Sequence, residues 1–145
     1  MTSRELWEAF RAETGLPETE YQAWSFGGDG DLLAQLVYRG EKTATASAGI
    51  LYALEQEPLP QPGQYSVILN SREEAVCIIR TTAVTAVPFW AVTEAHARKE
   101  GEGDKSLSYW QEVHRAWFSR ELAEEGLSFC EDMEVVCEEF EVVYR

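Results

Sequence analysis

The sequence has few cysteines and no motif that pairs them. Three cysteines, at positions 77, 130 and 137, are spread over 145 residues, and no C-x-x-C pair occurs. An odd count without such a pair indicates neither a disulfide framework nor a zinc knuckle. Cys77 and Cys137 each lie in an apolar run, where a cysteine packs as a small buried side chain. We therefore expect a reduced protein, located in the cytoplasm.

The chain also lacks a long hydrophobic run. No stretch approaches the roughly 20 apolar residues that a membrane-spanning helix needs. The residues Met1–Glu5 lack the apolar segment of a signal peptide. Repeats, low-complexity tracts and Gly/Ser linkers are absent as well, which predicts a single domain over residues 1–145, with residues 1–20 as an N-terminal helical extension. We expect no association with a membrane.

The chain also has few basic residues. There are 12 Lys and Arg residues against 26 Asp and Glu residues, a net charge of -14. Such a chain repels a phosphate backbone on average, which excludes a general nucleic-acid coat and argues against DNA as a partner. Residues 1–99 carry 8 basic and 13 acidic side chains, whereas residues 100–145 carry 4 and 13. This distribution leaves room for a small nucleoside substrate, or for RNA at a local basic patch in the first part of the chain.

Hydrophobic periodicity predicts helices and strands that alternate irregularly. Helices are expected over residues 4–14, 48–55, 88–100 and 106–124, and a further helix after Asp29 or Asp31 that ends at Gly40. Strands are expected over residues 64–70, 75–87 and 133–144, the first two as a hairpin. This order favours an α+β fold over a doubly wound parallel sheet.

The segment Glu41–Ser47 holds the first candidate for chemistry, the pair Lys42 and Thr45. A turn or bulge there would bring the two side chains together, and in a dry cleft a lysine can act as a base toward a threonine hydroxyl. The alternative is a surface loop in which Thr45 or Ser47 caps the following helix. Residue types alone favour this alternative.

The second candidate is the pair His96 and Glu100, whose i, i+4 spacing places both on one helical face. Glu100 could act as a general acid or base supported by His96, or the two could bind a metal, or they could form an exposed polar face. The metal site is the least favoured of the three, because no third ligand follows at a fixed spacing. We expect no metal and no cofactor. The loop that follows supplies Asp104 or Ser106 as a cap for the next helix.

Aromatic residues are frequent, with five tryptophans. Trp24 and Phe26 lie beside glycines and could offer a stacking surface to a base, although core packing is the commoner fate of such side chains. The glycines that follow do not match a dinucleotide-binding fingerprint, because no strand–glycine–helix pattern surrounds them.

Taken in order, these motifs resemble the ASCH domain family. The resemblance runs from about Trp24 to Tyr144 and rests on G-E-K-T-A-T at positions 40–45, the hairpin after Gly63, Pro88-Phe89, the run at positions 96–104, Trp110 and His114. It implies a PUA-like β-barrel with flanking helices, a fold associated with RNA or modified nucleosides. The residues by themselves predict only the α+β class.

One bacterial branch of this family is an amidohydrolase that removes acetate from N4-acetylcytidine. Its Lys-Thr-x-Thr motif, and its glutamate four residues after a histidine, match Lys42, Thr45 and Glu100. The resemblance implies that Thr45 attacks the acyl carbonyl, that Lys42 takes its proton, and that Glu100 relays or returns a proton. The predicted substrate-binding residues are Trp24, Phe26, Tyr52 and His96. The chain departs from that branch in its length, in its N-terminal helix, and in having Ser47-Ala48 where the branch has Arg-Asp.

Other family members are described as RNA binders or ribonucleases, so an RNA-binding module or a ribonuclease is the alternative function. It requires a local positive surface, for which the candidates are Arg39, Lys42, Arg72, Arg80, Arg98, Lys99 and Lys105. A degenerate member that serves as an interaction protein is a third interpretation. The sequence leaves the oligomeric state open.

Overall fold

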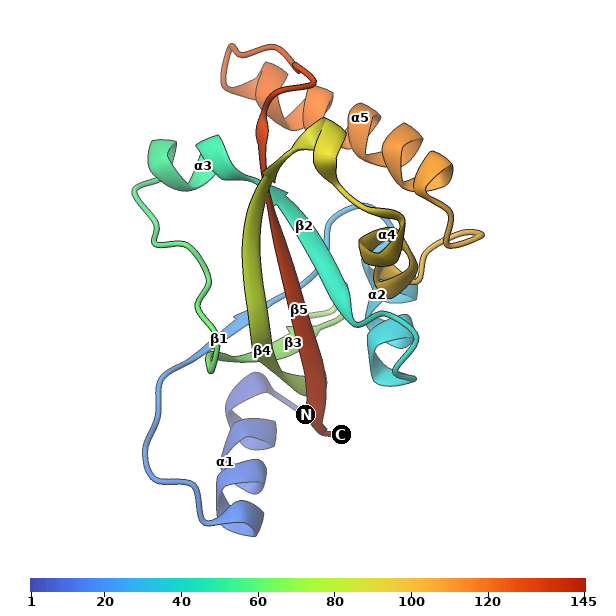
Figure 1. Cartoon of the computed structure of the whole chain (residues 1–145). Coiled ribbons are helices and arrows are strands. Elements are labelled where there is room, and N and C mark those ends of the chain that lie inside the picture. The colour runs from blue at the N-terminus through green and yellow to red at the C-terminus, as the bar shows by residue number, and fades with distance from the viewer.

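Five strands form one mixed sheet through the centre of the protein (Figure 1). The computed structural model describes all of residues 1–145. The strands are β1 (Tyr21–Trp24), β2 (Ala44–Ala48), β3 (Tyr65–Leu69), β4 (Ala75–Pro88) and β5 (Glu134–Tyr144). Their order is β1-β3-β4-β5-β2; β1 pairs parallel with β3, and every other pair is antiparallel.

The α+β class and the PUA-like fold are confirmed, but the sheet is not closed into a barrel. Strands β1 and β2 form its two edges and do not pair with each other. The 14-residue β4 pairs with β3 along its first half and with β5 from Ile78 to Pro88. Its pairing with β5 has register shifts at Ile78/Ile79 and Thr81/Ala83. Irregularities of this kind increase the twist of a strand. The long strands therefore curve the sheet while its edges stay apart.

Helix α1 (Ser3–Thr14) lies near both chain ends and covers one end of the sheet (Figure 1). A capping box starts it, in which Thr2 and Glu5 each bond the other's backbone N–H. Its buried residues Leu6, Trp7 and Phe10 pack against Val67 of β3 and Ile78 of β4. The predicted helix over residues 4–14 is confirmed, and its apolar stripe is what attaches it to the sheet.

Helix α2 (Gly30–Tyr38) follows Asp29, whose side chain accepts from the backbone N–H of Leu32, as the sequence predicted. Its buried Ala34 and Val37 pack on the core around Phe140 of β5. Helix α3 (Gly49–Leu54) is confirmed, but the prediction that Thr45 or Ser47 caps it is wrong. Its N-cap is Ala48, because residues 44–48 are drawn into β2 by pairing with β5.

The single helix predicted over residues 88–100 is wrong, because two elements occupy this range. A short 3₁₀ helix, η1 (Phe89–Ala91), ends at Val92, and α4 (Glu94–Glu100) begins after Thr93. Val92 and Thr93 both have extended backbone, and the Thr93 side chain accepts from the N–H of His96. The threonine cap therefore separates the two helices.

Helix α5 (Leu107–Glu124) is confirmed, with Ser106 as its N-cap. Its Trp110 and Phe118 join Phe89 in a buried aromatic core. In Figure 1, α2, α4 and α5 lie on the same side of the sheet. None of the helices combines the length and the apolar character that a membrane crossing requires.

Candidate active site

A tight turn after α2 carries Lys42 into the interior. The backbone N–H groups of Glu41 and Lys42 both donate to the carbonyl of Leu36, and Gly40 has a φ of 78°. The N–H of Thr43 then donates to the carbonyl of Lys99 at the end of α4. Lys42, just before β2, is 1% exposed. The turn lets Lys42 and Thr45 line the same pocket, although a regular strand would send them to opposite faces.

Glu100, the last residue of α4, is the most heavily hydrogen-bonded side chain of the site. Its side chain is 2% exposed. Oxygen Oε1 lies 3.3 Å from Nζ of Lys42 and 3.5 Å from Nε2 of His114. Oxygen Oε2 lies 2.6 Å from Nε2 of His96 and accepts from Nε1 of Trp110 at 2.5 Å. Three elements, α4, α5 and the turn before β2, thus converge on one carboxylate.

These contacts decide the charge of Glu100. Burial by itself raises the pKa of a carboxyl group, because it disfavours the charged form. Hydrogen bonds from His114 and His96, together with the charge of Lys42, outweigh burial and hold the pKa of Glu100 well below its usual value. Glu100 is therefore a firmly ionised counter-ion at neutral pH.

The two histidines are themselves oriented by neighbouring groups. Nδ1 of His114 lies 2.9 Å from the carbonyl oxygen of Trp110, within hydrogen-bonding distance. The His114 ring also stacks on the Trp110 indole at 4.1 Å between centroids. The ring of His96 lies edge-on to the same indole, at 6.1 Å. Both rings are thereby held against Glu100.

A second carboxylate contacts Lys42. Oε2 of Glu102 lies 2.8 Å from Nζ, closer than Glu100, and the Glu102 side chain is 18% exposed. The glycines on either side of Glu102 hold it there with positive φ values of 69° and 58°. A Cβ at Gly101 would overlap the carbonyl oxygen of Glu41, and one at Gly103 would lie 2.5 Å from the ring of Tyr109. Glycine fits at both positions without overlap and without the strain that a side chain has at positive φ.

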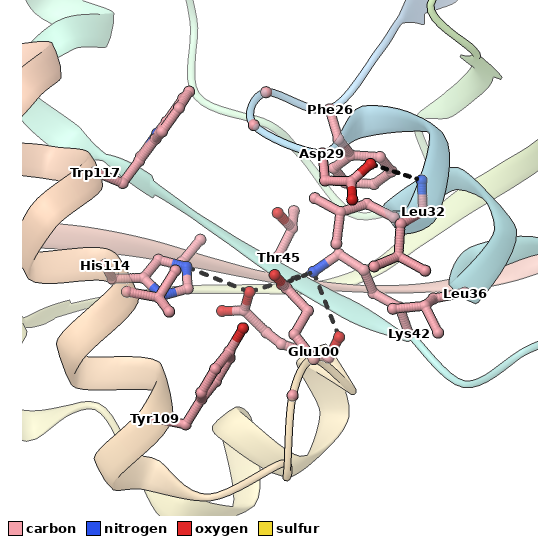
Figure 2. Close-up of a pocket in the computed structure, with 17 residues that line it drawn as sticks. Phe26, Asp29, Leu32, Leu36, Lys42, Thr45, Glu100, Tyr109, His114 and Trp117 are labelled. Atoms are coloured by element: carbon pink, nitrogen blue, oxygen red, sulfur yellow. Dashed lines mark hydrogen bonds and ion pairs between the residues drawn. The ribbon is translucent and has the colours of Figure 1, made fainter.

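Lys42, Thr45 and Glu100 line a pocket of about 350 Å³, within the size range of sites for small ligands. Figure 2 shows the three side chains gathered between α2 and α5. The wall contributed by α2 and the preceding loop includes Phe26, Asp29, Leu32 and Leu36, and the wall contributed by α5 includes Tyr109, Val113, His114 and Trp117. A hydroxyl, an ammonium group and the two carboxylates that contact it form a set suited to acyl transfer.

Of the four predicted substrate-binding residues, one lines this pocket. Phe26 lines it, and Trp24 packs edge-on behind Phe26 at 4.8 Å between ring centroids. His96 does not line the pocket but holds Glu100. Tyr52 lies on α3, where its hydroxyl is 2.7 Å from that of Ser47, and it does not line the pocket.

Sequence reasoning missed Glu102, Tyr109 and Trp117 as site residues, and it named His114 only among the motif residues of the family. Tyr109, Val113 and Trp117 recur every four residues along α5, a spacing that places them on one helical face and was visible in the sequence. Glu102 between two glycines carried no comparable signal, because its position depends on how the loop packs. No group of three or more His, Cys, Asp or Glu side chains is placed to hold a metal ion.

Several of the basic side chains considered for an RNA surface are paired with acidic groups. Lys42 is buried between two carboxylates, Arg39 lies 3.3 Å from Glu41, and Lys99 lies 2.7 Å from Glu139. These pairs reduce the positive charge that the region around the pocket offers to a phosphate backbone.

A family model described as the ASCH domain matches residues 22–144. The chain belongs to the ASCH domain family. The resemblance read from the ordered motifs is therefore confirmed, over nearly the same residues.

Two solved structures resemble this ASCH domain over nearly its whole length. The ASCH domain from Lactobacillus crispatus JV V101 is 38% identical, with a TM-score of 0.92, over 99% of this chain and 94% of that one. Protein EF3133 from Enterococcus faecalis V583, assigned to the family DUF984, is 40% identical, with a TM-score of 0.90, over 97% of this chain and 87% of that one. Both similarities include α1, which precedes the part matched by the family model.

A more distant ASCH protein from Zymomonas mobilis shares the fold. It is 12% identical, with a TM-score of 0.53, over 84% of this chain and 67% of that one. No curated protein matches this ASCH domain.

Proposed function

We propose that this ASCH domain hydrolyses an amide bond in a small modified nucleoside such as N4-acetylcytidine. The observation that carries the proposal is that Lys42, Thr45 and Glu100 line one pocket. The residue types match the motif of the amidohydrolase branch that the sequence resembles. Hydroxyl, amine and carboxylate groups of this kind perform nucleophilic and general acid–base catalysis in acyl transfer.

The reaction begins at Thr45. Its Oγ1 attacks the acyl carbon, and the π electrons of the carbonyl move to the carbonyl oxygen. Lys42 takes the hydroxyl proton, and because its ammonium is ion-paired, it passes one of its own protons to a neighbouring carboxylate. Glu100 is the relay that the family resemblance implies. The C–N bond then breaks, the amine leaves with a proton, and water hydrolyses the ester on Thr45 to acetate.

The pocket walls support a nucleoside as the substrate. Phe26, Tyr109 and Trp117 offer aromatic faces on which a base can stack. The acidic side chains of Asp29, Glu100 and Glu102 outnumber Lys42 in the pocket lining, so a phosphate group would be repelled. The charge therefore favours a nucleoside over an RNA strand.

The test is the release of acetate and cytidine from N4-acetylcytidine by the wild type, by Lys42→Ala and by the surface control Lys99→Ala. We expect turnover by the wild type and the control, and a loss in kcat/KM of at least about 100-fold for Lys42→Ala, the usual range for a lost general base. Circular dichroism checks that both variants fold. Equal turnover by wild type and Lys42→Ala, or no product from the wild type, would contradict the proposal. Salt-sensitive binding of single-stranded RNA by an inactive wild type would favour the RNA-binding alternative.

A further inference from the structure

We infer that Glu102, rather than Glu100, is the carboxylate that accepts and returns the proton passing through Lys42. The inference rests on the proposed amide hydrolysis and assigns one of its steps to a residue that the sequence motif does not include. Both carboxylates contact Nζ of Lys42, Glu102 at 2.8 Å and Glu100 at 3.3 Å. The two carboxylates differ in how many other hydrogen-bond donors contact them.

Glu100 has no oxygen free to take a proton. Oε1 faces Lys42 and His114, while Oε2 faces His96 and Trp110. A hydrogen on Oε1 would point at the Lys42 ammonium, and one on Oε2 would point at the Trp110 N–H, although both of these groups can only donate. The same contacts hold the pKa of Glu100 well below its usual value, and a carboxylate of this kind is a weak proton acceptor. Glu100 therefore serves as the fixed counter-ion that positions Lys42.

Glu102, by contrast, has a single side-chain donor and is partly exposed. Its carboxylate accepts one side-chain hydrogen bond, from Lys42, through Oε2 alone. The side chain is 18% exposed and lines the pocket. A proton can reach Oε2 directly from Nζ, and Oε1 keeps its lone pairs for water or substrate. Glu102 can thus change protonation state without dismantling a buried network.

The loop geometry keeps Glu102 at this distance. Gly101 packs against the backbone of Glu41 and Lys42, and Gly103 packs under the ring of Tyr109. The N–H of Lys105 donates to the carbonyl of Glu102 at 2.9 Å. The backbone on both sides of Glu102 is therefore fixed relative to Lys42, so little reorganisation precedes the proton transfer.

The proton movements balance in both half-reactions. As Thr45 Oγ1 bonds to the acyl carbon, its proton moves to Nζ of Lys42 while a proton of Nζ moves to Oε2 of Glu102. When the C–N bond breaks, the proton on Glu102 returns through Lys42 to the leaving nitrogen. In the second half, the water oxygen bonds to the ester carbon and a water proton follows the same route to Glu102. The bond between the acyl carbon and Oγ1 then breaks, and that proton returns through Lys42 to Oγ1 of Thr45. One water is consumed, and the products are the acid and the amine.

The test compares kcat and KM for the wild type, Glu102→Ala, Glu102→Gln and Glu100→Ala, with Glu41→Ala as a control on the exposed side of the same turn. We expect both Glu102 variants to lose at least about 100-fold in kcat with little change in KM, and Glu41→Ala to match the wild type. Added formate should raise the kcat of Glu102→Ala at least about tenfold, because a small carboxylate can enter the partly exposed site. Formate should not rescue Glu100→Ala, because the lost carboxylate also holds His96, His114 and Trp110 in place.

The results of these assays separate a failure of the Glu102 assignment from a failure of the proposed hydrolysis. Glu102 variants that retain kcat within about threefold of the wild type overturn the inference but leave the proposed hydrolysis intact. A folded Glu102→Ala that is inactive with and without formate also overturns it, because the side chain then acts by structure alone. A wild type that releases no acetate contradicts the proposed function, and the inference fails with it. Glu102→Gln, which keeps the size of the side chain, replaces Glu102→Ala if the latter unfolds.

Discussion

Replacing Lys42 with methionine should destabilise the protein by about 3 kcal/mol, because it leaves Glu100 with an unpaired charge in the interior. The Lys42 and Glu100 side chains are 1% and 2% exposed. Removing one member of such a pair typically costs about 3–5 kcal/mol. We expect the lower end, since Glu100 keeps His96, His114 and Trp110, and Glu102 is exposed enough to regain water.

The assay is urea unfolding at neutral pH, followed by tryptophan fluorescence and circular dichroism. Lys99→Met is the matched control, because Lys99 forms an ion pair with Glu139 but is 49% exposed. That change should cost less than about 1 kcal/mol. The double variant Lys42→Met/Glu100→Gln should recover at least about half of the loss, since neither charge then remains. A cost for Lys42→Met below about 1 kcal/mol would refute the reasoning.

Two further predictions concern Glu100 and the loop after it. Because the pKa of Glu100 is held low in the folded state, its contribution to stability is complete above the usual value of 4.5 and is lost as the pH falls through the lower folded value. The free energy of unfolding, measured by urea titration between pH 7 and pH 3, should therefore fall more steeply with decreasing pH for the wild type than for Glu100→Gln. The difference corresponds to about one proton that Glu100 binds on unfolding, and parallel curves would contradict this. Gly101→Ala should cost at least about 2 kcal/mol more than Gly126→Ala in the same assay. Both glycines have a φ near 70°, but a Cβ at Gly126 meets nothing within 4 Å whereas one at Gly101 meets the Glu41 carbonyl, so equal costs would contradict the packing described.

The elements that sequence reasoning found are those with a strong local signal. Helices α1 and α5 have apolar stripes and clear caps at Thr2 and Ser106. Strand β2 was missed because Ala44–Ala48 has no alternation of large apolar and polar side chains, and pairing with β5 determines its conformation. Strand β1 has four residues and pairs with β3, more than 40 positions later in the chain. The break at Thr93 was missed although a threonine three residues before His96 is a cap signal.

The site residues, too, were predicted where a motif identified them and missed where tertiary packing alone places them. Lys42, Thr45 and Glu100 were named from the family motif, since spacing alone could not say that a turn at Gly40 brings them to one pocket. The contacts of Glu102 with Lys42 and of His114 with Glu100 could not be predicted, because they depend on how a loop and a helix pack. The predicted barrel differs from the open sheet because closure depends on the pairing of the edge strands, which no local pattern reveals.

The covalent step is the most direct test of the proposed catalysis. The measurement is mass spectrometry of the protein quenched during turnover of N4-acetylcytidine, with Thr45→Val and Thr43→Val as matched variants, since Thr43 bonds the Lys99 carbonyl and does not line the pocket. The proposed mechanism predicts an acetyl group on Thr45 in the wild type and in Thr43→Val, and no acetylation or turnover in Thr45→Val. Full turnover by Thr45→Val, or turnover by the wild type with no acetyl group found on Thr45, would contradict it.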